Sequence, residues 1–176
     1  MRPAGHRPIP EVCISLKRMN APAPNGDSAG VIAPAPIFFL IASAIGAVLE
    51  WLRPSTLLAE PYARFVGAIL IAISIALVAA VLVQMARAKT SFDANKPTSV
   101  LITSGVFRIS RNPTYLSLLL LQAGLAFALQ SLWLLSLVVP AVDVTHWGVV
   151  VREEQYLRRK FGSEYERYAS GVRRWL

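Results

Sequence analysis

The sequence predicts an all-α integral membrane protein with four transmembrane helices. First, 55% of the 176 residues are hydrophobic, and they gather in long uncharged runs. Second, the runs have helical periodicity rather than the alternation of a membrane β-strand, and only helices satisfy their backbone groups over such lengths in lipid. Third, basic residues lie almost entirely on one side of the predicted spans, as is typical of cytoplasmic segments.

The first two uncharged runs each predict one transmembrane helix. Residues 31–49 and 65–86 contain no charged side chain. A bilayer span needs about 20 apolar residues. We therefore expect helices over 34–52 and 64–87.

The third run, residues 114–151, is too long for one helix and predicts a tight hairpin of two. It holds one formal charge, Asp143. Gln130 and Ser131 interrupt the apolar residues near the middle of the run. We therefore expect helices over 113–129 and 132–152.

The flanking segments are predicted to lie outside the membrane. Residues 1–30 are rich in proline, glycine and alanine, so we expect a disordered extension before a single domain over 31–176, with Met19 as a second candidate start. Residues 87–112 form a cytoplasmic loop. Residues 153–176 form a cytoplasmic tail in which Gly162 ends one helical piece and a short amphipathic helix follows.

The net charge of +8 reflects membrane topology. Four basic residues precede the first predicted helix, five lie in 87–112 and seven follow the fourth helix, whereas two lie between the first and second helices. This distribution predicts that both termini lie in the cytoplasm. We expect the membrane to be the inner membrane of a bacterium. Membrane lipids are expected partners. Nucleic acid is not, because no basic face is interleaved with stacking aromatics. The lone Cys13 offers no disulfide, and no metal site is expected.

The first set of polar residues that need an explanation stands at the start of the third predicted helix. Pro113 suits the first helical position, so Arg111 and Asn112 sit where free backbone N–H groups and the helix dipole favour an anion. Arg111 could grip a carboxylate or phosphate with two hydrogen bonds. The alternative is an interfacial cap, with a snorkelling arginine and with Tyr115 at headgroup level.

The second and third sets lie on the fourth predicted helix. Asp143 and His146 are one turn apart, and Glu153 lies seven residues beyond His146, which predicts one polar helix face. The alternative is an acid–histidine pair that only holds helices together. Glu153 and Glu154 stand at the helix exit and could accept hydrogen bonds from an amine or a ribose. A solvated charge cluster is the alternative there.

Together these sets predict a small-molecule site on the cytoplasmic side. A tight hairpin makes the entrance of its first helix and the exit of its second helix neighbours. Arg111 on one side and the two glutamates on the other suit a zwitterion with an amine and a carboxylate. An ionisable pair inside the membrane is also compatible with a proton or ion path in a transport component or with a non-catalytic scaffold.

Two sequence stretches carry a family resemblance. "TSGVFRISRNPTYL", an apolar hairpin and then "REEQYLRRKFGSEYERYASGVRRWL" resemble the isoprenylcysteine carboxyl methyltransferase and phospholipid methyltransferase superfamily of membrane enzymes. Its signature is Arg-His-Pro-x-Tyr, an apolar stretch, Glu-Glu and then Phe-Gly-x-x-Tyr. The likeness covers about residues 90–176.

The resemblance implies S-adenosyl-L-methionine as cofactor, bound in a pocket that the cytoplasmic loop and the tail form. The implied activity is methylation of a lipophilic or lipid-modified acceptor, as in isoprenylcysteine carboxyl O-methylation, with phospholipid or small-amine N-methylation as the alternative. With Arg111 from the argument above, the expected cofactor-binding residues are Ser99, Val100, Leu101, Ile102, Phe107, Arg111, Asn112, Pro113, Thr114, Tyr115, Glu153 and Glu154.

Three positions depart from the family pattern. Asn112 replaces the signature histidine and can exchange hydrogen bonds but cannot act as a base. Ser117 stands where a glycine often follows the tyrosine. Val149 stands where the carboxyl methyltransferases have a substrate-facing arginine, which weakens the expectation of a carboxylate acceptor. If the acceptor is an amine or a phenol, His146 oriented by Asp143 is the expected catalytic base.

Overall fold

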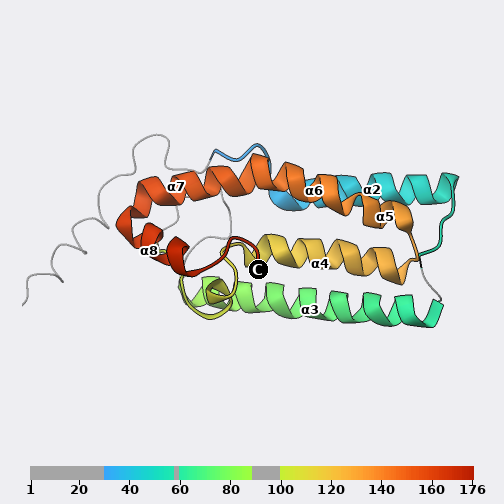
Figure 1. Ribbon diagram of the computed structural model, residues 1–176, viewed down its shortest axis with the longest axis horizontal. Helices are drawn as coiled ribbons and strands as arrows, with labels where there is room; N and C mark the ends of the chain where they lie inside the picture. The colour runs from blue at the N-terminus through green and yellow to red at the C-terminus, as the bar shows by residue number, and fades with distance from the viewer. Residues whose placement is uncertain (1–29, 58–59, 89–99) are drawn as a thin grey trace, which may run out of the picture.

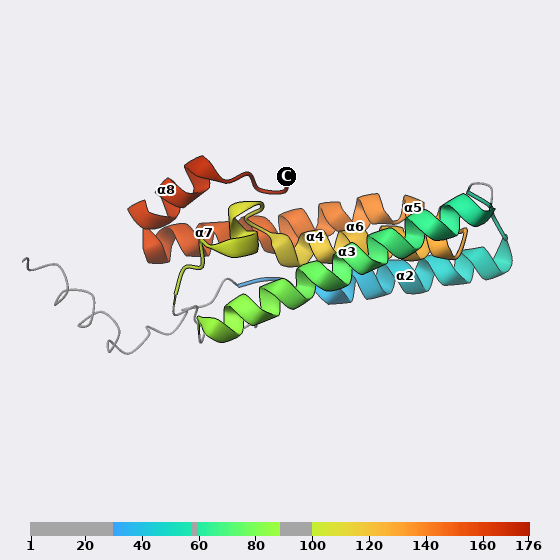
Figure 2. The ribbon, with the colours of Figure 1, turned by 90° about the horizontal axis from the view of Figure 1, so that it is seen from below.

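The computed structural model describes residues 30–57, 60–88 and 100–176, and these residues form helices and no strand (Figure 1). The predicted disordered extension lies outside the described residues, apart from Gly30. The helices run alternately up and down one bundle, and a final short helix folds back at one end (Figures 1 and 2). The elements in order are α2 (Ala35–Leu52), α3 (Glu60–Arg87), the 3-10 helix η1 (Gly105–Arg108), α4 (Pro113–Ala128), α5 (Leu132–Ser136), α6 (Val138–Thr145), the π-helix η2 (His146–Val150), α7 (Val151–Phe161) and α8 (Ser163–Gly171).

The predicted all-helical class is confirmed, and the helices begin and end close to the predicted residues. Pro113 occupies the first turn of α4 with Asn112 before it, and Gly162 ends α7 with a positive φ of 53°. Within the described residues, three helical segments are long and apolar enough to cross a membrane: Ala35–Leu52, Glu60–Arg87 and Leu132–Phe161. The apolar α4 is shorter, with 16 residues.

Helices α3 and α4 pack with their backbones in close approach because small residues line their contact. A Cβ atom on Gly67 would lie 2.8 Å from the carbonyl oxygen of Gly124, and one on Gly124 would lie 2.8 Å from the side chain of Ile71. The Ser74 hydroxyl also donates to the carbonyl of Ser117 at 2.7 Å. Small residues and hydroxyl bonds of this kind join helices in lipid, where apolar burial alone does not.

The outer surface of the bundle is apolar. Large hydrophobic side chains along α2 and α3 are exposed, with Leu40 and Phe65 each more than 60% accessible. Inside, Phe39 and Ala42 of α2 meet Ala141 of α6 in a small buried cluster. A surface of this kind would be costly in water and suits lipid contact.

A polar network joins the loops at the end of the bundle opposite α8. The two carboxylate oxygens of Glu50 accept hydrogen bonds from the Ser55 amide, the Ser55 hydroxyl and the Ser131 hydroxyl at 2.6, 2.7 and 2.5 Å. The Trp133 indole donates to the Arg53 carbonyl at 2.8 Å. The connection after α2 is thereby fastened to the turn between α4 and α5.

The fourth arm contains a π-helical turn that the sequence did not predict. Over η2, Gly148, Val149 and Val150 are all buried, which a regular α-helical stripe does not allow. The Gly148 carbonyl accepts a hydrogen bond from the Ile32 amide at 3.4 Å. Single π-turns in helices are rare and occur frequently at functional sites.

Candidate functional site

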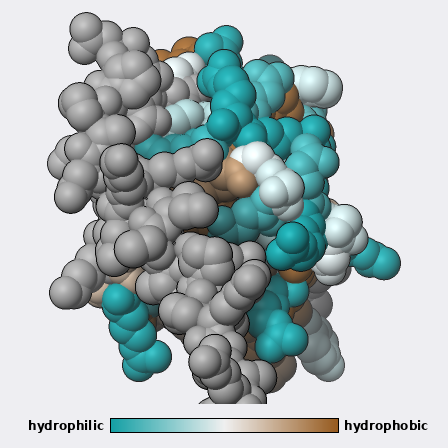
Figure 3. Space-filling model, turned by 90° about the vertical axis from the view of Figure 1, so that its left-hand side faces the viewer, coloured by the Kyte–Doolittle hydropathy of each residue, from teal (hydrophilic) through white to brown (hydrophobic). Residues whose placement is uncertain are grey.

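Most of the predicted site residues gather at one end of the bundle, where α4 and α7 begin and α8 folds back (Figure 1). Hydrophilic residues dominate the described surface at this end (Figure 3). This contrasts with the apolar sides of the bundle. The hairpin therefore brings together the helix entrance and the helix exit that the sequence predicted to be neighbours.

The loop before α4 is held from two sides. The amide of Gln84 on α3 donates to the Ser104 carbonyl at 2.7 Å and accepts from the Val106 amide at 3.0 Å. Gly105 between them has a φ of +57°, and a Cβ atom there would clash with the Gln84 side chain. From the other side, the Tyr168 hydroxyl on α8 donates to the Phe107 carbonyl at 2.6 Å. These bonds fix the path of the chain toward Arg111.

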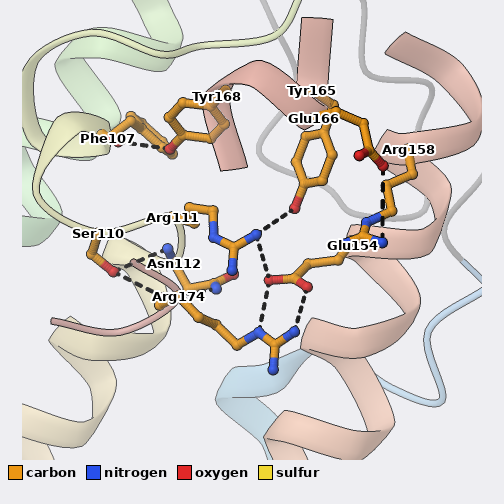
Figure 4. Close-up of polar contacts among 10 residues, drawn as sticks. All are labelled: Phe107, Ser110, Arg111, Asn112, Glu154, Arg158, Tyr165, Glu166, Tyr168 and Arg174. Atoms are coloured by element: carbon orange, nitrogen blue, oxygen red, sulfur yellow. Dashed lines mark hydrogen bonds and ion pairs between the residues drawn. The ribbon is translucent and has the colours of Figure 1, made fainter. Parts of the chain in front are cut away.

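Glu154 is the centre of a buried charge cluster (Figure 4). Its carboxylate, 7% exposed, accepts two hydrogen bonds from the Arg174 guanidinium at 2.9 and 2.8 Å. Arg111 approaches the same carboxylate at 3.5 Å and donates to the Tyr165 hydroxyl at 3.4 Å. Two guanidinium groups therefore share the carboxylate of Glu154, with the carboxylate of Glu153 beside it in the first turn of α7. The Arg111 Nε atom is buried without a hydrogen-bond partner among the described residues.

Two tyrosines of α8 line this cluster in their neutral form. Burial raises the pKa of Tyr168 to about 12, with the neighbouring Tyr165 adding to the shift and Arg111 opposing it. Burial, and then the Glu154 carboxylate, raise the pKa of Tyr165. The hydrogen bond to Glu154 raises the pKa of Arg174, so this guanidinium stays charged. At neutral pH both tyrosines are therefore uncharged: the Tyr165 hydroxyl accepts from Arg111, and the Tyr168 hydroxyl donates to the Phe107 carbonyl.

Glu153 has a partner of its own. The Tyr115 hydroxyl on α4 donates to its Oε2 atom at 2.7 Å, which links the first turn of α4 to the start of α7. The second carboxylate oxygen of Glu153 makes no hydrogen bond to the described residues. Within the part of the chain that the structure describes, this carboxylate therefore keeps an oxygen that can accept a hydrogen bond from a ligand.

Asn112 is buried and holds the C-terminal segment. Its side-chain nitrogen donates to the Arg174 carbonyl at 3.0 Å, and its backbone amide donates to the Ser110 hydroxyl at 3.1 Å. The side-chain nitrogen of Asn112, at the position of the signature histidine, is thus already hydrogen-bonded within the protein. Pro113 beside it is fully buried.

The structure does not bring Asp143 and His146 into contact. Asp143 lies exposed on α6, and neither side chain makes a hydrogen bond or ion pair within the described part of the chain. The centroid of the His146 ring instead lies 5.0 Å from that of the Trp147 ring and 6.2 Å from that of the Trp175 ring. The π-turn that starts at His146 interrupts the regular spacing on which the predicted polar face to Glu153 depended.

The remaining predicted residues surround the loop and the entrance of α4. Val100 is exposed, and Leu101, Ile102, Phe107 and Thr114 are half-buried. Ser99 lies outside the described residues. Val149, where carboxyl methyltransferases have an arginine, is 1% exposed and so presents no polar group.

Sequence reasoning missed three residues of this end: Tyr165, Tyr168 and Arg174. For Arg174, the available signal was its place as the second arginine of "RRWL". The two adjacent glutamates come before the basic tail, and "RRWL" comes after it. Spacing alone does not select which of seven basic residues pairs with Glu154. The end of the chain had to be placed beside α4 before Arg174 could be recognised.

Comparison with known proteins identifies the family. The phospholipid methyltransferase family profile matches residues 62–164, more than half of the chain. The chain is also 43% identical over 63 residues to an uncharacterized protein of Haemophilus influenzae, a match that covers 35% of this chain and 98% of that protein. No solved structure matches the chain. The superfamily that the sequence predicted is confirmed: the chain belongs to the phospholipid methyltransferase family.

Proposed function

We propose that this chain is an integral membrane methyltransferase that uses S-adenosyl-L-methionine and methylates a lipophilic acceptor. The observation that carries the proposal is the junction of α4 and α7, where Arg111 meets Glu154 and Tyr115 meets Glu153. In a chain of this family, charged and hydrogen-bonding groups converge there at the polar end of an apolar bundle.

The groups at this junction fit the methionine end of the cofactor. Arg111 has a buried Nε atom without a described partner and shares Glu154 with Arg174, so its guanidinium keeps hydrogen-bonding capacity that suits a carboxylate. The open oxygen of Glu153 is suited to accept hydrogen bonds from the ammonium group. Tyr115 holds that carboxylate in place from the opposite helix.

The chain's own contribution to the reaction is binding, alignment and exclusion of water. S-adenosyl-L-methionine supplies an activated methyl group when bound. Methyl transfer from a sulfonium needs mainly proximity and alignment. The buried position of Asn112 and Glu154 limits water at this end. For an amine or phenol acceptor, His146 is the candidate to take the proton, with the rings of Trp147 and Trp175 fixing its position.

Four spans with both termini in the cytoplasm complete the proposal. Sixteen residues at about 1.5 Å each make α4 about 24 Å long. This is slightly less than the hydrocarbon core of roughly 30 Å. Helix α4 lies along the much longer α3 and joins it through Gly67 and Gly124, which supports a short fourth span within the bundle.

Binding of the cofactor is the first test. Detergent-purified wild-type protein is titrated by calorimetry with S-adenosyl-L-methionine and S-adenosylhomocysteine, together with Glu153→Ala and the matched control Glu164→Ala. Glu164 is an exposed carboxylate on α8. We expect saturable binding that Glu153→Ala weakens by about tenfold or more, the size of a lost charge-assisted hydrogen bond, and that the control retains. No binding by folded wild-type protein would contradict the proposal and favour a scaffold or transport role.

The amine headgroup of a phospholipid is the first acceptor to test. The family and the apolar, buried Val149 both favour it over a carboxylate. Purified protein in vesicles that contain phosphatidylethanolamine receives methyl-labelled S-adenosyl-L-methionine, and an isoprenylcysteine analogue is tested in parallel. Label in the lipid fraction supports N-methylation. Label in the analogue alone would assign the chain to carboxyl O-methylation.

A further inference from the structure

The last residues of the chain, 172–176, return from α8 to the entrance of α4. Val172 is extended, with φ of −127° and ψ of 130°. The Arg173 carbonyl accepts from the Arg111 amide at 3.0 Å. The next carbonyl, of Arg174, accepts from the Asn112 side chain at 3.0 Å and the Ser110 hydroxyl at 3.2 Å. Three hydrogen bonds on two successive carbonyls therefore fix this segment to the loop before α4.

The side chain of Arg174 fastens the same segment to α7. Its guanidinium bonds both oxygens of Glu154, while its own side chain remains 37% exposed. Arg111 lies 3.5 Å from the same carboxylate and is only 12% exposed. If Arg174 leaves, Glu154 keeps Arg111 as a partner and is not left as an unpaired buried charge. Such an arrangement lowers the cost of releasing the chain end.

Trp175 brings the segment into contact with His146, the residue predicted to act on the acceptor. Its ring lies 6.2 Å from the His146 ring, with an angle of 34° between the two planes. The segment thus spans from Asn112, on the proposed cofactor side, to His146, on the proposed acceptor side. A ligand that reaches both residues must pass beside or beneath it.

We propose that residues 172–176 are a strap that closes the methyltransferase site, with Arg174 as its positioning residue and Trp175 as the side chain that covers His146. This inference rests on the proposed function. The closed strap holds Asn112 in place and shields the site from water, and it opens by releasing Arg174 from Glu154 while Arg111 stays. The role of Arg174 is to place other groups, so its substitution changes ligand-dependent behaviour of the strap.

The strap is tested by hydrogen exchange on the full-length protein in detergent, with and without S-adenosylhomocysteine. In the wild type we expect the amides of 172–176 to become more protected when the compound binds. Arg174→Gln is expected to remove that protection and weaken binding by about tenfold. The protection and the affinity of Arg174→Lys should lie between those of the wild type and Arg174→Gln, because lysine cannot form the bidentate contact with Glu154. Arg167→Gln, the same change at an exposed residue of α8, is the matched control.

A second readout follows Trp175 directly. The fluorescence emission of Trp175 is obtained as the difference between the spectra of the wild type and of Trp175→Phe. We expect S-adenosylhomocysteine to shift this emission in the wild type but not in Arg174→Gln. A change in fold stability alone would not produce that pattern.

The outcomes separate the strap from the proposed function. Equal binding and equal protection in wild type, Arg174→Gln and Arg174→Lys would overturn the strap while the cofactor site stands. Binding by the wild type without any change in exchange at 172–176 would overturn the strap without reference to a variant. No binding by folded wild-type protein would overturn the proposed function, and the strap's role with it.

Discussion

Each end of the bundle holds a glutamate that is bound by segments far apart in sequence. The two ends differ in how many of their polar groups lack a described hydrogen-bond partner. At the end with the α4–α5 turn, Glu50 receives three hydrogen bonds from Ser55 and Ser131. At the α7–α8 end, Glu154 faces two guanidinium groups, and Arg111 keeps an Nε atom without a described partner. Glu153 beside it uses one of its two oxygens.

This difference distinguishes a structural tie from a site. Buried polar groups are normally satisfied, so a group left without a partner needs an explanation. The Glu50 network joins two loops and satisfies its acceptor, which accounts for all of its contacts. At the Glu154 cluster, two guanidinium groups share one carboxylate and the Arg111 Nε atom has no described partner, so hydrogen-bonding capacity remains for a charged ligand.

The largest effect is expected from Glu154→Ala. The change leaves Arg174 and the buried Arg111 facing each other without their shared carboxylate. Removing one partner of a buried ion pair typically costs about 3–5 kcal/mol. We expect a clear fall in the thermal unfolding midpoint in detergent and faster hydrogen exchange over 172–176.

The control for this prediction is Glu166→Ala. Glu166 is 64% exposed and its nearest basic atom, on Arg158, is 3.9 Å away. Exposed pairs of this kind contribute about 0–1 kcal/mol. An unfolding midpoint for Glu154→Ala equal to that of the control would show that the cluster does not hold this end together.

The next effect is expected from Ser131→Ala at the opposite end. Ser131 is fully buried, caps α5 by accepting from the Leu134 amide at 3.2 Å, and donates to Glu50. Loss of a helix cap of this kind costs about 1–2 kcal/mol. Stability should fall, but calorimetric affinity for S-adenosylhomocysteine should stay at the wild-type value. A large loss of affinity would contradict the assignment of this end as a purely structural tie.

Much of this comparison could be predicted from the sequence. The uncharged runs and Pro113 located the helices, and the short hairpin turn made the entrance of α4 and the start of α7, where the fourth span was predicted to end, neighbours. That neighbourhood is geometric, because two antiparallel helices joined by a tight turn must bring their far ends together. It correctly grouped Arg111, Tyr115 and the two glutamates at one end.

The parts that were not predicted depend on packing rather than on spacing. The seven-residue count from His146 to Glu153 assumes a regular α-helix, and the π-turn over His146–Val150 breaks that assumption. No distinctive residue in the sequence indicates this turn. Arg174 pairs with Glu154 only because α8 folds back and returns the chain end to α4. Asp143, which spacing grouped with His146, lies exposed on α6.

The smallest stability effect is expected from Tyr115→Phe, which removes one hydroxyl at the site end, as Ser131→Ala does at the other. The lost hydrogen bond to Glu153 should cost about 0.5–1.5 kcal/mol of stability. Unlike Ser131→Ala, this change frees the Glu153 carboxylate to move, so calorimetry should show weaker binding of S-adenosylhomocysteine with the protein still folded. The two single-hydroxyl variants thus separate stability from binding. If both leave the affinity unchanged, the unfilled capacity at the α7–α8 end does not serve the cofactor, and the difference between the two ends would need another ligand to explain it.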